Sequence, residues 1–323
     1  MKTILTNKIS QAAAFIKKGE VCAFPTETVW GLGANAYDEK AVRRIFKAKG
    51  RPGDNPLIVH ISSKKDIKVL ASDITDTAKK IIKQFFPGPV TVILKKNEIV
   101  PDIVTAGLDT IAIRMPSLKL TRDFIKSCGV PVAAPSANIS GSPSPTSFIH
   151  VLQDFEGKIP CLLIGPDAKY GLESTVIDCT VEPAVVLRPG VVTIEELRKI
   201  DKRINLAIKT AKVKSPGQKY RHYAPSAQVR IISDFKLSYW TPLEQFADSK
   251  AKAYIGLKNL PKKYHGKFVR YYVAGNIEDY ARKLFAFFRM CDSMGIKTIY
   301  AGTVPEKGIG TAIMNRLRKT LTL

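Results

Sequence analysis

Short runs of β-branched and aromatic residues alternate with amphipathic segments through the first 200 residues of this chain. Period-two and continuous apolar runs predict strands at 21–24, 56–61, 90–95, 110–114, 130–134, 161–164, 174–178 and 184–187. Helical periodicity predicts helices at 8–18, 39–48, 76–86, 120–128, 147–155 and 194–200. This alternation is typical of α/β proteins, so we expect a sheet of mixed strand direction packed by helices.

The pattern changes between residues 206 and 227, where apolar periodicity stops and Pro216-Gly217 marks a turn. We predict an α/β domain at 1–205, a linker at 206–227 and a smaller α/β domain at 228–323. The linker is rich in Tyr, His and Arg, whereas a plain flexible tether favours Gly and Ser. In the second domain we predict strands at 228–232, 251–255, 268–273 and 298–301, and helices at 277–294 and 309–319.

The chain is strongly basic, with 51 Lys and Arg against 28 Asp and Glu and a net charge of +23. From residue 206 onward there are 22 basic and 7 acidic residues, so this part alone contributes +15. Such a field attracts nucleotides, RNA or acidic partners. A solvated lysine-rich surface would give the same count, because charge alone identifies no ligand.

Several classes of protein are disfavoured by what the sequence lacks. The five cysteines form no C-x-x-C pair and the four histidines are isolated, so we expect core cysteines and no protein-built metal site. No apolar run approaches the roughly 18 residues of a membrane span, and Lys8 interrupts the N-terminus before a signal-peptide core could form. We therefore expect a cytoplasmic protein that does not engage membranes. A P-loop motif is also absent.

Polar and cationic residues cluster where predicted strands and helices end. Taken alone, each cluster could be an ordinary loop or a solvated helix terminus. In open α/β sheets, however, ligands bind at the carboxyl ends of strands. Together the clusters favour a pocket for a phosphate-bearing anion beside a small polar ligand. They are the segments PTETVWGLG, KAKGRPGDNPL, AIRMP, AAPSANISGSPSPT, GLESTVID and VLRPG.

These segments, in this order, resemble the threonylcarbamoyl-AMP synthases, which carry a YrdC-like domain. The paired signature of that family is K-x-R, here Lys49 and Arg51, with S-x-N, here Ser136 and Asn138. The segments SPGQKYRHYAP and GIGTAIMNRLRK extend the resemblance to the two-domain branch of the family. Trp30 is a departure, because relatives usually have Tyr there.

The resemblance implies a fold and an activity. The fold is a YrdC-like twisted mixed sheet with helices around a basic cavity, plus a smaller Rossmann-like α/β C-terminal domain. The activity is synthesis of L-threonylcarbamoyladenylate and pyrophosphate from L-threonine, bicarbonate or CO2, and ATP, with Mg2+ accompanying the ATP. A partner threonylcarbamoyl-transferase complex then modifies the tRNA adenosine beside the anticodon, and direct tRNA contact by this chain is left open.

The resemblance also implies site residues, carried over motif by motif. The signature residues Lys49, Arg51, Ser136 and Asn138 form the expected catalytic set. The expected threonine-binding set is Thr28, His60, Arg114, Ala134 and Ser174. The expected ATP-binding set is Arg51, Asn55, Thr110, Ser136, Ser144, Arg188 and Tyr220. Since Tyr220 lies in the predicted linker, we expect that segment to fold over the cavity as a lid.

Two other functions are compatible with parts of the sequence. An RNA-binding module without adenylating activity would explain the charge, although the basic motifs are not interleaved with stacking aromatics. A hydrogenase-maturation carbamoyltransferase shares a YrdC-like domain but adds zinc-finger parts, and this chain has no C-x-x-C.

Overall fold

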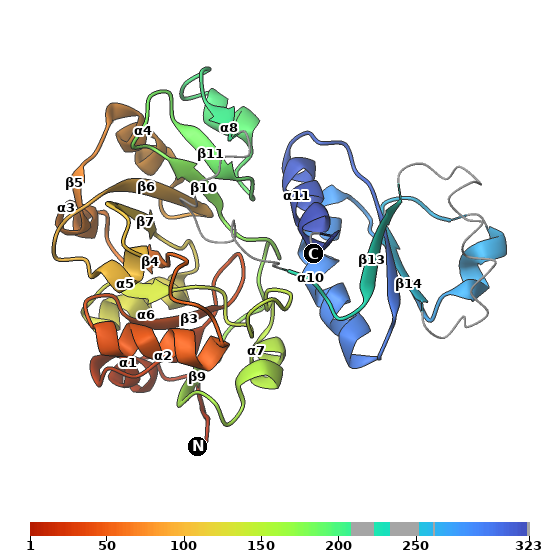
Figure 1. Cartoon of the computed structure of the whole chain (residues 1–323), viewed down its shortest axis with the longest axis horizontal. Coiled ribbons are helices and arrows are strands. Elements are labelled where there is room, and N and C mark those ends of the chain that lie inside the picture. Colours follow the sequence, from red (N-terminus) through yellow and green to blue (C-terminus); the bar gives the residue numbers. More distant parts are fainter. Residues whose placement is uncertain (208–222, 233–251, 261, 322–323) are drawn as a thin grey trace. The chain divides into compact units, whose positions relative to one another are not determined.

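The computed structural model describes residues 1–207, 223–232, 252–260 and 262–321. Its contacts divide the chain into two compact units (Figure 1). The first comprises Met1–Ser140 and Ser144–Tyr220, and the second comprises Gly141–Pro143 and Arg221–Leu323.

Within the described residues, the first unit is built on a 12-stranded mixed sheet. Its strand order is β1-β9-β2-β3-β8-β4-β7-β6-β10-β11-β12, and β5 pairs with β6 outside this path. The strands are β1 (Ile4–Thr6), β2 (Cys22–Phe24), β3 (Gly31–Asn35), β4 (Ile58–His60), β5 (Ala71–Asp73), β6 (Val90–Lys96), β7 (Thr110–Arg114), β8 (Val132–Ala134), β9 (Cys161–Leu163), β10 (Thr175–Asp178), β11 (Val185–Arg188) and β12 (Asn205–Leu206).

Four helices of the first unit, those of residues 39–49, 76–85, 148–155 and 194–198, begin at a residue whose side chain caps the helix. Asp38 caps the helix of residues 39–49 by accepting from Ala41 N–H, and Gly50 ends that helix in the left-handed conformation. The helices are α1 (Ile9–Lys17), α2 (Glu39–Lys49), α3 (Ile67–Leu70), α4 (Asp76–Phe85), α5 (Asp102–Thr105), α6 (Lys119–Cys128), α7 (Phe148–Phe155) and α8 (Ile194–Arg198), with a 3-10 turn at Lys64–Asp66.

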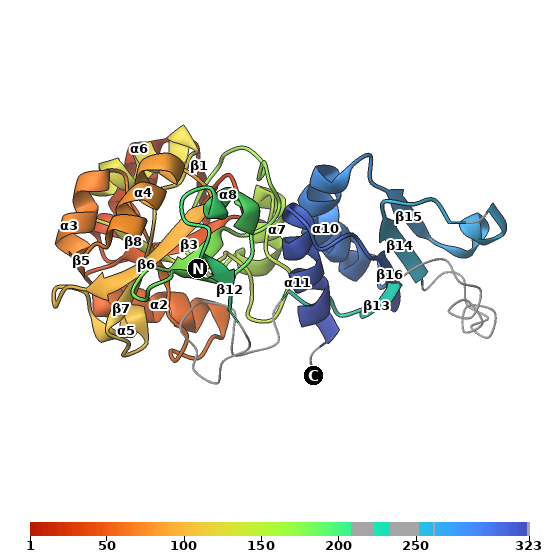
Figure 2. The same cartoon turned by 90° about the horizontal axis from the view of Figure 1, so that it is seen from above.

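The second unit contains, among the described residues, a four-stranded sheet of order β13-β16-β14-β15 whose neighbouring strands are all parallel. Helices α10 and α11 pack on one face of this sheet (Figures 1 and 2). The face of α10 at i, i+3, i+4 spacing is buried, as its periodicity predicts. The elements are β13 (Gln228–Ile232), β14 (Lys252–Gly256), β15 (Arg270–Val273), β16 (Thr298–Gly302), α10 (Ile277–Ser293), α11 (Ile309–Leu321) and the 3-10 helix Lys262–Lys267.

Each strand and helix predicted from the sequence is present, with ends shifted by at most a few residues. The predicted mixed strand direction is also confirmed. The five cysteines are free and buried, as expected. Among the described residues, no helix is both long and apolar enough to cross a membrane.

The sequence patterns did not predict the short elements β1, β3, β5, β12, α3 and α5, nor the 3-10 helices Lys64–Asp66 and Lys262–Lys267. Strand β3 is instructive, because its glycines favour a loop in the sequence. A Cβ at Gly33 would lie 2.5 Å from Val132 and 2.7 Å from Phe24, so the strand packs closely only because glycine has no side chain.

Candidate functional site

The two faces of the central sheet differ in character because successive strand residues point to opposite sides. One face contributes Val59, Val92, Ile113 and Ile177 to the main apolar core. The other carries a small apolar cluster that includes Ile58, Ile93, Ala112 and Val176. The same alternation places polar side chains on this second face, beyond the apolar cluster. They are His60 on β4, Arg114 on β7, Thr91 on β6 and Ser174 just before β10.

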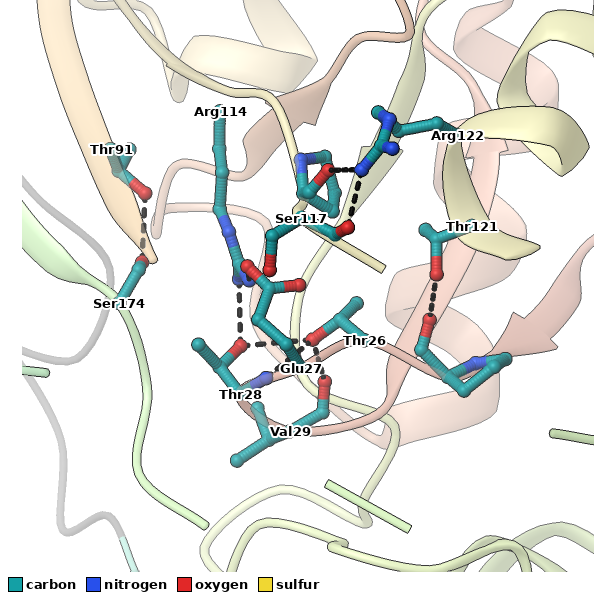
Figure 3. Close-up of polar contacts among 12 residues, drawn as sticks. Thr26, Glu27, Thr28, Val29, Thr91, Arg114, Ser117, Thr121, Arg122 and Ser174 are labelled. Atoms are coloured by element: carbon teal, nitrogen blue, oxygen red, sulfur yellow. Dashed lines mark hydrogen bonds and ion pairs between the residues drawn. The ribbon is translucent and has the colours of Figure 1, made fainter. Parts of the chain in front are cut away.

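Arg114 lies at the end of β7 and is held by the loop that follows β2 (Figure 3). Its Nη2 donates to Glu27 Oε1 at 2.7 Å, and its Nη1 donates to Thr28 Oγ1 at 2.8 Å. Thr26 Oγ1 lies 2.9 Å from Thr28 Oγ1 and fixes the loop by donating to the Val29 carbonyl at 2.6 Å. All of these polar side chains are buried.

Glu27 and Arg114 form a buried ion pair, with side chains only 5% and 4% exposed. Burial by itself would raise the pKa of Glu27, but the charge and hydrogen bond of Arg114 lower it overall. Glu27 is therefore ionised in the neutral range. Arg114 Nε is a buried donor without a hydrogen-bond partner in the described part of the chain, so the guanidinium keeps one N–H for a ligand.

His60 stands beside Arg114, because the two residues are register partners on the parallel strands β4 and β7. Its Nδ1 lies 3.0 Å from the Ile58 carbonyl, and its ring meets the Phe24 ring edge-on. Burial, followed by the charge of Arg114, lowers the pKa of His60 to about 3. The imidazole is therefore neutral at physiological pH.

Ser174 links a second group of side chains. Arg188, at the end of β11, donates from Nε to the Ser174 carbonyl and from Nη2 to Ser174 Oγ, both at 3.1 Å. Thr91 Oγ1 lies 2.8 Å from the same Ser174 Oγ. One residue from the predicted threonine set and one from the predicted ATP set are thus in direct contact.

The two halves of the K-x-R and S-x-N signature meet through Lys49. Its ammonium donates to the backbone carbonyls of Ser136 and Asn138, at 2.6 and 2.5 Å. Ser136 Oγ in turn donates to Asn138 Oδ1 at 2.5 Å. Lys49 is a buried residue at the end of α2, so it fastens the S-x-N loop to that helix.

Arg51 and Asn55 lie in the turn that leads from α2 toward β4. Arg51 Nη2 donates to the carbonyls of Asn55 and Pro56, at 3.2 and 3.4 Å. Asn55 is fully buried, and neither side-chain atom has a partner among the described residues. A buried amide without partners is costly, so this side chain is suited to receive a ligand.

The remaining predicted residues are distributed more widely. Ala134, at the end of β8, is the register partner of Ile58. Thr110 begins the strand that Arg114 ends, so the two lie roughly 13 Å apart along β7. Ser144 is buried and donates to Glu173 Oε1 at 2.6 Å. Tyr220 lies outside the described residues, as does Pro216-Gly217.

Four side chains in these networks were not among the predicted site residues: Thr26, Glu27, Thr91 and Glu173. Glu27 and Glu173 each precede a predicted residue within a polar run, and that position in the sequence could have identified them as site residues. Thr91 lies within an apolar strand, and nothing local distinguishes it. Within the described residues, no group of three His, Cys, Asp or Glu is placed to hold a metal ion.

Comparison with protein families gives two matches that together span most of the chain. A model described as "Telomere recombination" matches residues 14–190. A second, described as "Threonylcarbamoyl-AMP synthase, C-terminal domain", matches residues 192–320.

Similar proteins match nearly end to end. A threonylcarbamoyl-AMP synthase of Pyrococcus abyssi is 48% identical, with 97% of this chain and 93% of the relative covered. One of Bacillus subtilis is 40% identical, with 97% and 92% covered. A crystal structure of P. abyssi Sua5 complexed with L-threonine matches with a TM-score of 0.91 at 45% identity, covering 98% of this chain and 97% of that one. The chain belongs to the threonylcarbamoyl-AMP synthase family.

Proposed function

We propose that this chain is an L-threonylcarbamoyladenylate synthase, which joins L-threonine, CO2 from bicarbonate, and ATP, and releases pyrophosphate. The observation that carries this proposal is the likeness to two threonylcarbamoyl-AMP synthases over 97% of the chain. It favours an adenylate-forming enzyme over an RNA-binding module.

The threonine site of this proposal comprises Thr28, His60, Arg114, Ala134 and Ser174. Arg114 receives the substrate carboxylate, because its guanidinium is fixed by two hydrogen bonds and keeps a buried N–H. The neutral imidazole of His60 adds no second positive charge beside it.

The ATP site of this proposal comprises Arg51, Asn55, Thr110, Ser136, Ser144, Arg188 and Tyr220. Arg51 and Arg188 supply positive charge for the phosphates, and the Asn55 amide supplies a buried donor and acceptor. Lys49 and Asn138 contribute indirectly, because the hydrogen bond between them holds the S-x-N loop in place. Mg2+ would be held chiefly by the phosphates and water, and it would offset charge on the leaving pyrophosphate.

The chemistry needs orientation more than a covalent nucleophile. The deprotonated threonine amine adds to CO2 and releases a proton to solvent, which leaves a carbamate. A carbamate oxygen then attacks the α-phosphorus of ATP as the bond to pyrophosphate breaks. Holding bound reactants in line can lower a barrier by roughly 7–11 kcal/mol in favourable cases. The Ser174–Arg188 contact joins the two substrate sites and so supports this alignment.

The same proposal covers domains and partners. We assign 1–205 to the catalytic domain, 228–323 to the C-terminal domain, and 206–227 to a linker that closes over the site through Tyr220. The unstable adenylate would pass to a threonylcarbamoyl-transferase complex acting on tRNA in the cytoplasm. Direct tRNA contact is supported only by the net charge of +23.

The test is incorporation of labelled bicarbonate into an adenylate, together with pyrophosphate release. Both are expected to require threonine, ATP and Mg2+, and to stop when EDTA is added. Arg51→Ala should lower the rate at least about 100-fold, because charge on the transferring phosphate loses its partner. Arg43→Ala on the exposed side of α2 is the matched control and should retain the rate. Threonine-independent release of pyrophosphate, or a fully active Arg51→Ala, would refute the proposal.

A further inference from the structure

The charges around Arg114 cancel within a few ångströms. Arg114 and Glu27 form an ion pair of 2.7 Å, Thr28 adds an uncharged hydroxyl, and His60 is neutral. The cluster therefore has no net charge, although the whole chain carries +23. Glu27 belongs to neither predicted substrate set.

We propose that Glu27 determines specificity at this cluster: paired with Arg114, it favours a zwitterionic amino acid over anions of similar shape. The inference rests on the threonine site proposed above and adds to it a role for the carboxylate of Glu27. Glu27 acts on the substrate through Arg114 and through its own negative charge, so it is a positioning and specificity residue.

The physical argument starts from the anions that this enzyme must handle. ATP, pyrophosphate and bicarbonate are all negative, and each would be drawn to an unpaired buried guanidinium. A fixed carboxylate against Arg114 weakens that attraction for every net anion. A zwitterion keeps its affinity, because its carboxylate faces the guanidinium while its ammonium gains from the nearby negative charge.

The geometry supports a fixed pair. Glu27 Oε1 binds Nη2, Thr28 binds Nη1, and the loop that carries both is held by Thr26 (Figure 3). The Glu27 carbonyl also accepts the Tyr170 N–H at 3.0 Å, so the backbone on either side of the carboxylate is anchored. These contacts hold the carboxylate against the guanidinium of Arg114.

The experiment measures binding by the full chain without ATP, using isothermal titration calorimetry. The probes are L-threonine, (R)-3-hydroxybutyrate, which is threonine without its amine, and inorganic phosphate. Glu27→Gln keeps the shape and removes the charge. We expect the ratio of the hydroxybutyrate Kd to the threonine Kd to fall about tenfold or more, and phosphate to bind more tightly, as one nearby charge predicts.

Two comparisons make the outcome decisive. Glu39→Gln makes the same change at an exposed position of α2 and should leave all three affinities unchanged. If Glu27 had a purely structural role, Glu27→Gln would weaken the binding of threonine and of hydroxybutyrate by the same factor. An unchanged ratio of the two Kd values would therefore overturn the inference. If the unsubstituted protein binds no threonine, the proposed threonine site itself is wrong, which is a separate result.

Discussion

At the scale of single residues, Lys49 shows how a signature residue can hold a loop in place through the loop's backbone carbonyls. Its ammonium is buried and satisfies two backbone carbonyls of the loop that carries Ser136 and Asn138. A lysine is seldom buried unless it is paired in this way. The ammonium of Lys49 thus helps to fix the shape of the loop, whereas the proposed ATP site takes its positive charge from Arg51, two residues later.

Replacing Lys49 tests this assignment. Lys49→Met keeps most of the length of the side chain but removes the buried donor from both carbonyls, and the Ser136 carbonyl keeps another partner, the Asn138 N–H at 3.1 Å. We therefore expect a loss of roughly 1–3 kcal/mol in the free energy of unfolding. ATP affinity should fall with it, because the S-x-N loop loses its anchor. Urea denaturation and calorimetry measure the two effects. Lys47→Met on the exposed side of the same helix should change neither, and a stable Lys49→Met would contradict the scaffold role.

His60 predicts a pH dependence of stability. In the unfolded chain a histidine takes up a proton near pH 6.5, whereas the pKa of His60 in the fold is about 3. Lowering the pH from about 7.5 to about 5 therefore favours the unfolded state, by about 2 kcal/mol for this one group. In His60→Gln, the free energy of unfolding should fall less over this pH range, by about that amount, as denaturation curves recorded at each pH would show. The same pH dependence in the variant would show that His60 is not held neutral.

At the scale of elements, the end of α2 sets the position of Arg51. Gly50 adopts a φ of 60°, and the N–H of Arg51 bonds back to the Phe46 carbonyl at 3.0 Å. A Cβ at Gly50 would have no atom within 4 Å, so only the backbone conformation would oppose alanine there.

Two glycines in this turn therefore give a matched pair. Gly50→Ala should cost about 1 kcal/mol of stability, the strain of a left-handed conformation, and Gly50→Asn should cost less. Gly53 has equally open space and no positive φ, so Gly53→Ala should change stability by less than about 0.5 kcal/mol. Thermal unfolding of the three variants checks this order. Equal losses at both glycines would show that conformation is not the cause.

At the scale of the whole molecule, the net charge of +23 and the neutral cluster at Arg114 predict a strong response to salt for ATP and a weak one for threonine. Raising KCl from about 0.05 M to about 0.5 M screens long-range attraction, so the Kd of ATP should rise about tenfold. The Kd of threonine, a net-neutral ligand at a net-neutral cluster, should change by less than about twofold. Calorimetric titrations at several salt concentrations test this, and parallel changes in both constants would contradict it.

The sequence by itself determined where most strands and helices lie along the chain, and it contained the residues of the signature. Periodicity reports which side of an element is buried, and that local information was enough for α2, β4, β7 and α10. It was not enough for β3, because its glycines are typical of a loop. The ring that packs against them belongs to Phe24 on a neighbouring strand, which the local sequence of β3 does not show.

Only the tertiary structure decided how charges and hydroxyls are paired. Arg114 meets Glu27 across 87 positions of sequence, Lys49 reaches the Ser136 carbonyl across 87, and Thr91 reaches Ser174 across 83. These partners are set by strand order and register, which place distant residues on one face of a sheet. A local pattern contains no such information, so a cation at a strand end predicts a partner without identifying it.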